Sequence, residues 1–115
     1  MPTVFVIGED WQFRVSVRAE LRERGIEALG METIDDAARA LAVGTMPAAV
    51  VLDVTAGNVA RPTWENLARR VPVIVVASRS QAVPQTKSAA AVLWRPVQVA
   101  EIVAKVEEVL KGLAA

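Results

Sequence analysis

Residues 47–57 read PAAVVLDVTAG, a short run of apolar residues that stops on an aspartate. The run shows no alternation of apolar and polar residues, so it predicts a strand that is buried on both faces of a parallel sheet. Burying an ionised carboxylate costs several kcal/mol unless a partner compensates for the lost hydration. We therefore expect Asp53 to lie at the edge of the sheet and not in its core.

Similar apolar runs recur on both sides of this segment, and stretches of helical periodicity separate them. In the first such stretch Phe13, Val17 and Leu21 recur every four residues, which indicates one buried helix face. Thr33 and Asp36 form a capping-box pattern for the second helix. Strands are expected at residues 3–8, 26–31, 48–54, 71–78 and 91–97, and helices at 11–24, 34–44, 63–70 and 97–113.

The alternation of strands and helices determines the expected fold class. Connections that are too long for hairpins favour right-handed crossovers, and therefore a parallel sheet with helices on both faces. We expect a flavodoxin-like, doubly wound α/β fold with five strands in the order 2-1-3-4-5. Residues 78–91 include Pro84 and few large apolar residues, so we expect the fourth of five helices to be short or missing.

Composition limits the classes of function. With 115 residues, of which 53% are hydrophobic, we expect the chain to form one domain, residues 1–115. Lys plus Arg equals Asp plus Glu, at 13 each, which argues against a nucleic-acid or membrane-surface partner. Histidine and cysteine are absent, which excludes zinc sites and histidine-based catalysis. No apolar run has the length of a membrane span, so a cytoplasmic location is expected.

Three acidic residues are expected to meet at one edge of the sheet. Ligands of such folds bind beyond the carboxyl ends of the strands, where Glu9 and Asp10 follow the first strand and Asp53 ends the third. Clustered carboxylates favour a hard cation such as Mg²⁺, and Arg95 at the end of the fifth strand adds a fixed positive charge. Alternatively, Asp53 caps a turn while Glu9 and Asp10 begin a helix. The residues alone leave both interpretations open.

Four segments, in order and covering most of the chain, resemble the receiver domain of two-component response regulators, the CheY-like family. The segments are GEDWQFR (8–14), PAAVVLDV (47–54), VPVIVVAS (71–78) and AVLWRPV (91–97).

This resemblance implies specific roles for the residues at the edge of the sheet. Asp53 takes the place of the phosphoacceptor, which receives a phosphoryl group from a histidine kinase or phosphotransfer protein. Arg95 stands where the family has a phosphate-contacting lysine. The resemblance implies that Glu9, Asp53 and the backbone carbonyl of Thr55 hold Mg²⁺, with Asp10 as a further candidate ligand. Receivers are not enzymes beyond self-phosphorylation and autodephosphorylation, which would take place at Asp53.

Several positions depart from the family pattern and predict weakened switching. Gly8 replaces the first acid of the family's acidic pair, and Val92 replaces an aromatic residue of the switch. Ala77 replaces the switch Thr or Ser, and Ser78 is the candidate substitute hydroxyl. A hydrogen bond to an anionic phosphoryl group contributes roughly 1.5–3 kcal/mol. The alternative function is a phosphorylation-independent pseudo-receiver that acts as a protein–protein interaction module.

Three further expectations concern a pairing surface, Trp11 and other ligands. In receivers, the surface formed by the fourth helix, fifth strand and fifth helix often pairs with a second copy. Ile102 and Val109, a heptad apart and off the main apolar face of the last helix, suggest a homodimer there, although two such residues are also normal on a surface helix. Trp11 is expected to pack at the start of the first helix. A nucleotide- or flavin-binding domain is disfavoured because Gly8 is the only glycine in the first loop.

Overall fold

The structure is a computed structural model, and it describes residues 2–54, 61–78 and 89–114. The elements in chain order are β1 (Thr3–Ile7), α1 (Trp11–Glu23), β2 (Glu27–Met31), α2 (Ile34–Ala42), β3 (Ala49–Asp53), α3 (Arg61–Arg70), β4 (Val73–Ala77), β5 (Ala91–Trp94) and α4 (Val99–Ala114).

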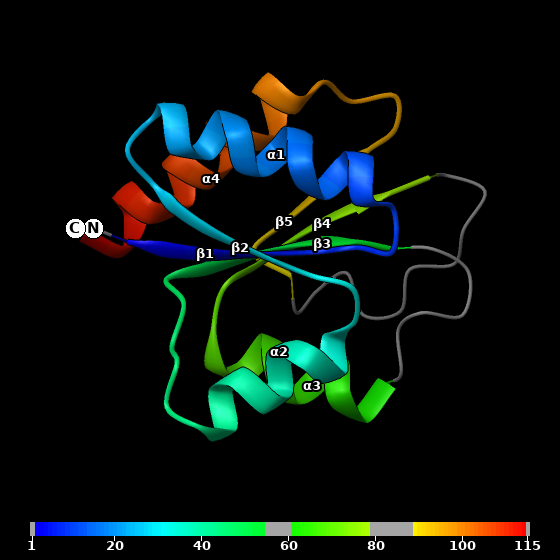
Figure 1. The fold of residues 1–115 in the computed structure, drawn as a ribbon, viewed down its shortest axis with the longest axis vertical. Helices are drawn as coiled ribbons and strands as arrows, with labels where there is room; N and C mark the ends of the chain where they lie inside the picture. The colour runs from blue at the N-terminus through cyan, green and yellow to red at the C-terminus, as the bar shows by residue number, and fades with distance from the viewer. Residues whose placement is uncertain (1, 55–60, 79–88, 115) are drawn as a thin grey trace.

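The five strands form one parallel sheet in the order β2-β1-β3-β4-β5. Helices α1 and α4 cover one face of this sheet, and α2 and α3 cover the other (Figure 1). The predicted fold class and strand order are therefore confirmed. In a sheet wound in this way, the carboxyl ends of β1 and β3 lie side by side at the point where the winding reverses.

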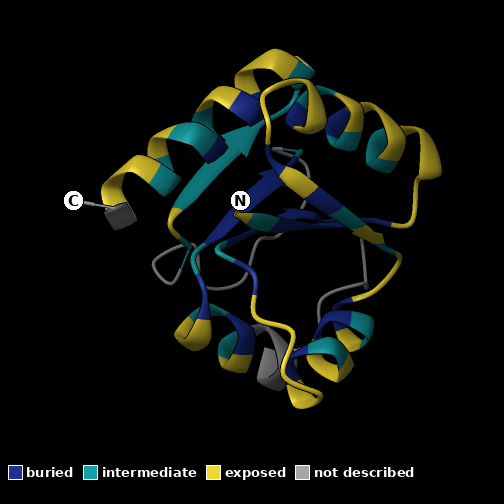
Figure 2. Ribbon diagram, turned by 60° about the vertical axis from the view of Figure 1, so that its left-hand side comes forward, coloured by how far each residue is buried: buried dark blue, intermediate teal, exposed yellow. Residues whose placement is uncertain are grey.

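The central strands are buried on both faces, as the unbroken apolar runs predict (Figure 2). Successive side chains point to opposite faces of a sheet, so alternate residues build two separate cores. Phe5 and Leu52 belong to the core under α2 and α3, whereas Val6 and Val51 belong to the core under α1 and α4. Each face thus has its own apolar layer.

Local signals in the sequence determine where the first two helices begin and end. The predicted capping box of α2 is present: the Thr33 hydroxyl accepts from the backbone N–H of Asp36, and the Asp36 carboxylate accepts from that of Thr33. Gly25 has φ of 78° directly after the α1 cap, and Gly44 has φ of 93° after α2. Both are left-handed conformations in which glycine avoids the strain of a Cβ.

Some predicted boundaries differ from the observed ones. Strand β5 ends at Trp94 and not at residue 97, because its partner β4 ends at Ala77, which pairs with Trp94. Helix α4 accordingly begins at Val99, two residues later than predicted. Helix α3 begins at Arg61, two residues earlier than predicted. The prediction of a short or missing helix in residues 78–91 falls mainly on residues 79–88, which lie outside the described residues.

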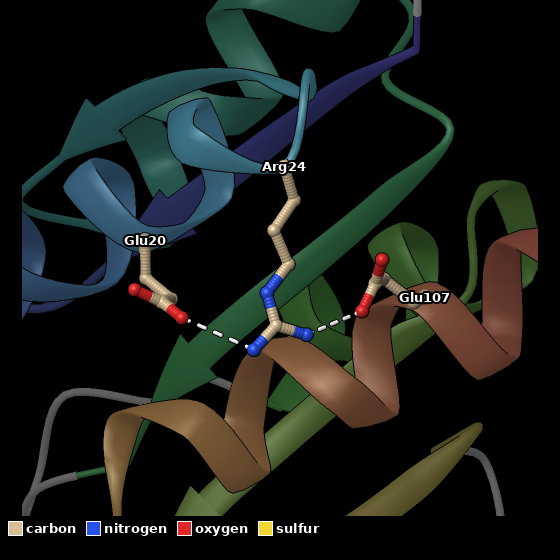
Figure 3. Close-up of polar contacts among 3 residues, drawn as sticks. All are labelled: Glu20, Arg24 and Glu107. Carbon is tan, nitrogen blue, oxygen red and sulfur yellow. Dashed lines mark hydrogen bonds and ion pairs between the residues drawn. The ribbon is translucent and has the colours of Figure 1, made fainter.

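A charged bridge joins the two helices on one face of the sheet. Arg24, the C-cap residue of α1, donates to Glu20 on its own helix at 3.1 Å and to Glu107 on α4 (Figure 3). Both carboxylates raise the pKa of Arg24 above its ordinary value, chiefly through these hydrogen bonds. The bridge lies at the surface and supplements the apolar contact between α1 and α4.

The buried face of α4 includes a residue that the sequence predicted to lie off the main apolar face of this helix. Ile102 is only 2% exposed and belongs to the core under α1 and α4. Val109 is partly buried and packs against the same core. The interpretation of these two residues as a pairing surface is therefore wrong, because Ile102 faces the sheet.

Two arginines of α1 cover the outer edge of strand β2. The N–H of Glu27 donates to Pro2 on the β1 side, so the next residue, Ala28, directs its carbonyl to the free edge of the sheet. That carbonyl accepts from Nε of Arg18 at 3.3 Å and from Nη2 of Arg22 at 3.5 Å.

Candidate functional site

Asp53 is the last residue of β3, at the carboxyl edge of the sheet where the sequence predicted it. Its position in the strand alternation is that of Val51, which belongs to the core under α1 and α4. The residue is only 2% exposed and is the one charged or polar residue that is buried in the described part of the chain. An ionised carboxylate in such a place requires a compensating positive charge.

Arg95 supplies that charge. It follows β5 directly, and its backbone N–H donates to the Ala77 carbonyl at 2.8 Å, which fixes the end of β5 against the end of β4. Its Nη2 atom donates to Oδ1 of Asp53 at 2.6 Å. Asp53 and Arg95, predicted to lie at one edge of the sheet, are therefore in direct contact.

Phe13 is a third member of this site, although the sequence pattern predicted a different role for it. The centre of the Arg95 guanidinium lies 5.7 Å from the centroid of the Phe13 ring, within the range of a cation–π interaction. The periodicity of α1 identified Phe13 only as a residue of the buried helix face. Its place in the first turn of α1, beside the acidic loop, was the available signal for a role in the site.

Gly8 lies between these groups. A Cβ atom built on Gly8 would be 3.0 Å from Cβ of Asp53 and 3.3 Å from Cδ1 of Phe13. Both distances are tighter than nine in ten real Cβ contacts, so Asp53 or Phe13 would have to move by a few tenths of an ångström. Asp53 and Phe13 therefore occupy the space that a side chain at position 8 would need.

The other two predicted acids lie in the loop between β1 and α1, and both are exposed. Asp10 is the N-cap of α1, and its carboxylate accepts from the backbone N–H of Gln12 at 3.0 Å. Arg14 holds this loop by donating from Nη1 to the carbonyls of Gly8, at 2.6 Å, and Glu9, at 3.1 Å. The interpretation of Asp10 as a helix-start residue is confirmed.

These carboxylates do not form a group suited to Mg²⁺ as described. No three acidic side chains among the described residues are close enough together to hold a metal ion. Gly8 contributes no carboxylate, Glu9 is exposed, and Oδ1 of Asp53 already accepts from a guanidinium. Mg²⁺ prefers near-octahedral oxygen ligation, which this donor set does not supply. Thr55, whose carbonyl was a predicted ligand, lies outside the described residues, so that ligand stays a prediction.

The remaining site predictions concern Ser78 and Trp11. Ser78 is half-buried and follows directly after β4; its role as a substitute switch hydroxyl stays a prediction. Trp11 is 61% exposed at the first position of α1, so the expectation that it packs is wrong. Trp94 instead packs with Val92 against the core under α2 and α3.

Comparison with solved structures identifies the architecture. The receiver domain of a Francisella response regulator is 16% identical to this chain, with a TM-score of 0.80. The match covers 98% of this chain and 99% of the Francisella domain. A receiver protein from Burkholderia phymatum is 24% identical, with a TM-score of 0.76, and covers 96% of each chain. The chain has the fold of a response-regulator receiver domain. At these identities the likeness establishes the receiver fold alone.

A third neighbour shows a ligand bound to another protein with this fold. The Thermotoga maritima response regulator TrrA, captured in complex with Mg²⁺ and beryllofluoride, is 18% identical to this chain, with a TM-score of 0.79; the match covers 95% of this chain and 99% of that one.

No protein-family model and no curated protein sequence matches the chain. Within the described residues, no helix combines the length and apolar character needed to cross a membrane.

Proposed function

We propose that the chain is a two-component signalling receiver that accepts a phosphoryl group on Asp53 from a histidine kinase or phosphotransfer protein. The observation that supports this proposal best is the ion pair between Asp53 and Arg95, 2.6 Å long, at the carboxyl edge of a receiver-type sheet. Paired carboxylates and cations at this edge are suited to phosphoryl transfer, which requires a nucleophile and a positive charge.

The proposed transfer needs no redox partner. A carboxylate oxygen of Asp53 forms a bond to phosphorus while the bond between phosphorus and the donor atom breaks. The electron pair of the broken bond leaves with the donor, which is an imidazole nitrogen of the kinase or the acetate of acetyl phosphate. The product is an acyl phosphate, and water later hydrolyses it to restore the carboxylate. This self-modification at Asp53 is the only chemistry that we propose.

Arg95 contributes to the transfer through its charge and shape. Its planar guanidinium can contact the Asp53 carboxylate and a phosphoryl oxygen with different N–H groups. Ala77 provides no hydroxyl to report the bound phosphoryl group, so Ser78 is the proposed substitute. Output from phosphorylation is consequently weaker than in a receiver with the usual switch residues.

Labelling with acetyl phosphate tests the proposal. The unmodified chain is expected to gain one phosphoryl group that hydroxylamine removes, as measured by intact mass, and Asp53→Asn is expected to abolish the gain. Asp35→Asn, which changes an exposed acid on α2, is the matched control and is expected to label normally. Labelling that persists in Asp53→Asn would exclude Asp53 as the acceptor.

A phosphorylation-independent pseudo-receiver is the second candidate. The observation that favours it is the buried position of Asp53, which is 2% exposed and neutralised by Arg95 before any donor arrives. In that case the chain would bind its partner with the same affinity before and after treatment with acetyl phosphate. Absence of labelling in the unmodified chain would favour this candidate.

A further inference from the structure

We propose that Arg95 is the resident counter-ion of Asp53 and that this site acts without a divalent metal ion. The claim about the counter-ion is independent of the proposed function, and only the labelling experiment below rests on it. The starting observation is the ion pair of 2.6 Å between side chains that are 3% exposed for Asp53 and 34% exposed for Arg95. A carboxylate removed from water in this way requires a cation, and the guanidinium already supplies one.

Phe13 lies beside both the Arg95 guanidinium and Gly8, the position where the receiver family has an acid. Its ring lies 5.7 Å from the centre of the Arg95 guanidinium, and its Cδ1 atom lies 3.3 Å from the place of a Cβ on Gly8. The same side chain therefore lies over the arginine and crowds the place of a side chain at position 8. Position 8 therefore offers no carboxylate to a metal ion, and the neighbouring Phe13 ring offers a partner to a guanidinium.

A divalent ion would have to displace this arrangement. Oδ1 of Asp53 is occupied by Nη2 of Arg95, and a second cation on the same carboxylate would repel the guanidinium. Glu9, the other predicted carboxylate ligand, is exposed in the loop held by Arg14. In this arrangement a covalently attached side chain supplies the positive charge that an exchangeable metal ion would otherwise supply.

A magnesium titration tests the claim without any phosphoryl donor. Thermal unfolding, followed by circular dichroism, is measured in EDTA and in increasing millimolar MgCl₂. The unmodified chain is expected to show no saturable shift in Tm. A saturable rise in Tm that Asp53→Asn abolishes would overturn the proposal.

Removing the arginine gives the complementary test. In Arg95→Met the Asp53 carboxylate loses the guanidinium, so this variant is expected to have a lower Tm than the double variant Asp53→Asn/Arg95→Met, in which position 53 carries no charge. A folded Arg95→Met with the same Tm as the double variant would overturn the claim that the guanidinium is the counter-ion of Asp53. If Arg95→Met does not fold, the titration of the unmodified chain decides. Asp35→Asn is the control for weak binding of Mg²⁺ to surface acids, and its response should match that of the unmodified chain.

Labelling with acetyl phosphate separates this inference from the proposed function. The rate of labelling in EDTA is expected to lie within about twofold of the rate in MgCl₂. Labelling that occurs only with MgCl₂ would overturn the inference and leave Asp53 as the phosphoacceptor. Absence of labelling under both conditions would overturn the phosphoacceptor role, and the titration alone would then decide on the counter-ion.

Discussion

Folding of the sheet removes the Asp53 carboxylate from water, so the energetic cost of its charge depends on the cation beside it. A guanidinium is more weakly hydrated than an ammonium group and can lie over an aromatic ring. Arg95 uses both properties, since it donates to Asp53 and lies over Phe13. Lysine at position 95 would keep the charge but lose the planar contact with the ring.

The packing around Gly8 leads to the first prediction at the residue scale. Gly8→Ala places a Cβ at 3.0 Å from Cβ of Asp53 and 3.3 Å from the Phe13 ring. We expect the free energy of unfolding to fall by about 1–3 kcal/mol, as for other overpacked cores. Urea unfolding measures the change.

Gly112→Ala is the matched control, because a Cβ at that position in α4 has no neighbour within 4 Å. It is expected to raise the free energy of unfolding by about 0.5–1 kcal/mol, because alanine favours the helix. Equal stability of Gly8→Ala and the unmodified chain would show that the site can move to accept a side chain.

The sequence predicted part of this arrangement. Asp53 and Arg95 each follow an apolar strand, and the carboxyl ends of parallel strands meet, so their proximity followed from topology. The contact of Phe13 with Arg95 did not, because it depends on how α1 is rotated against the sheet. Helical periodicity places Phe13 on the buried face without saying which strand end it meets. The exposure of Trp11 depends on the same rotation.

At the scale of elements, α2 shows how a local signal stabilises one helix end. The hydrogen bonds with Thr33, and to a lesser extent the charge of Arg39, hold the pKa of Asp36 below its ordinary 3.8. A carboxyl group with a lowered folded-state pKa contributes stability above its unfolded pKa and loses it as the pH falls through the folded value.

The pH dependence of Asp36→Asn tests this contribution. The variant is expected to be less stable than the unmodified chain at neutral pH, and the difference is expected to shrink as the pH falls below the ordinary pKa of an aspartate and Asp36 becomes protonated. Urea unfolding across this pH range measures the difference. Thr33→Val should weaken the same pH dependence, because it removes the hydroxyl partner. A difference that stays constant down to low pH would contradict the assignment.

Elements with strong local signals were predicted well, and the others less so. The start of α2 was predicted correctly because Thr33 and Asp36 act within one turn of the chain. The junction between β5 and α4 was placed less accurately. Apolar residues continue through it, and the sequence pattern does not mark where β5 stops pairing with β4.

At the scale of the whole molecule, the sheet separates two apolar cores, and α4 belongs to one of them. Ile102→Ala is expected to lower the free energy of unfolding by about 2–5 kcal/mol, because the residue is 2% exposed in that core. Urea unfolding measures this change. Val109→Ala, at the partly buried position one heptad later, is the control and should cost less.

The same two variants test the revised role of Ile102. If Ile102 belongs to the core, the loss of stability in Ile102→Ala relative to the unmodified chain should be the same at every protein concentration. A smaller effect for Ile102→Ala than for Val109→Ala would contradict the burial described here. The overall topology was predictable from the alternation of strands and helices, whereas the place of Ile102 on the buried side of α4 was not.

The arginines along β2 determine what the outer edge of the sheet can join. Strand β2 is the last in the order, and the outward carbonyl of Ala28 accepts from Arg18 and Arg22. An unpaired strand edge is a template on which another chain can polymerise. Here an incoming strand must first break two guanidinium contacts and then lie beside their charges. The arginines of α1 therefore oppose the addition of another strand at this edge of the sheet.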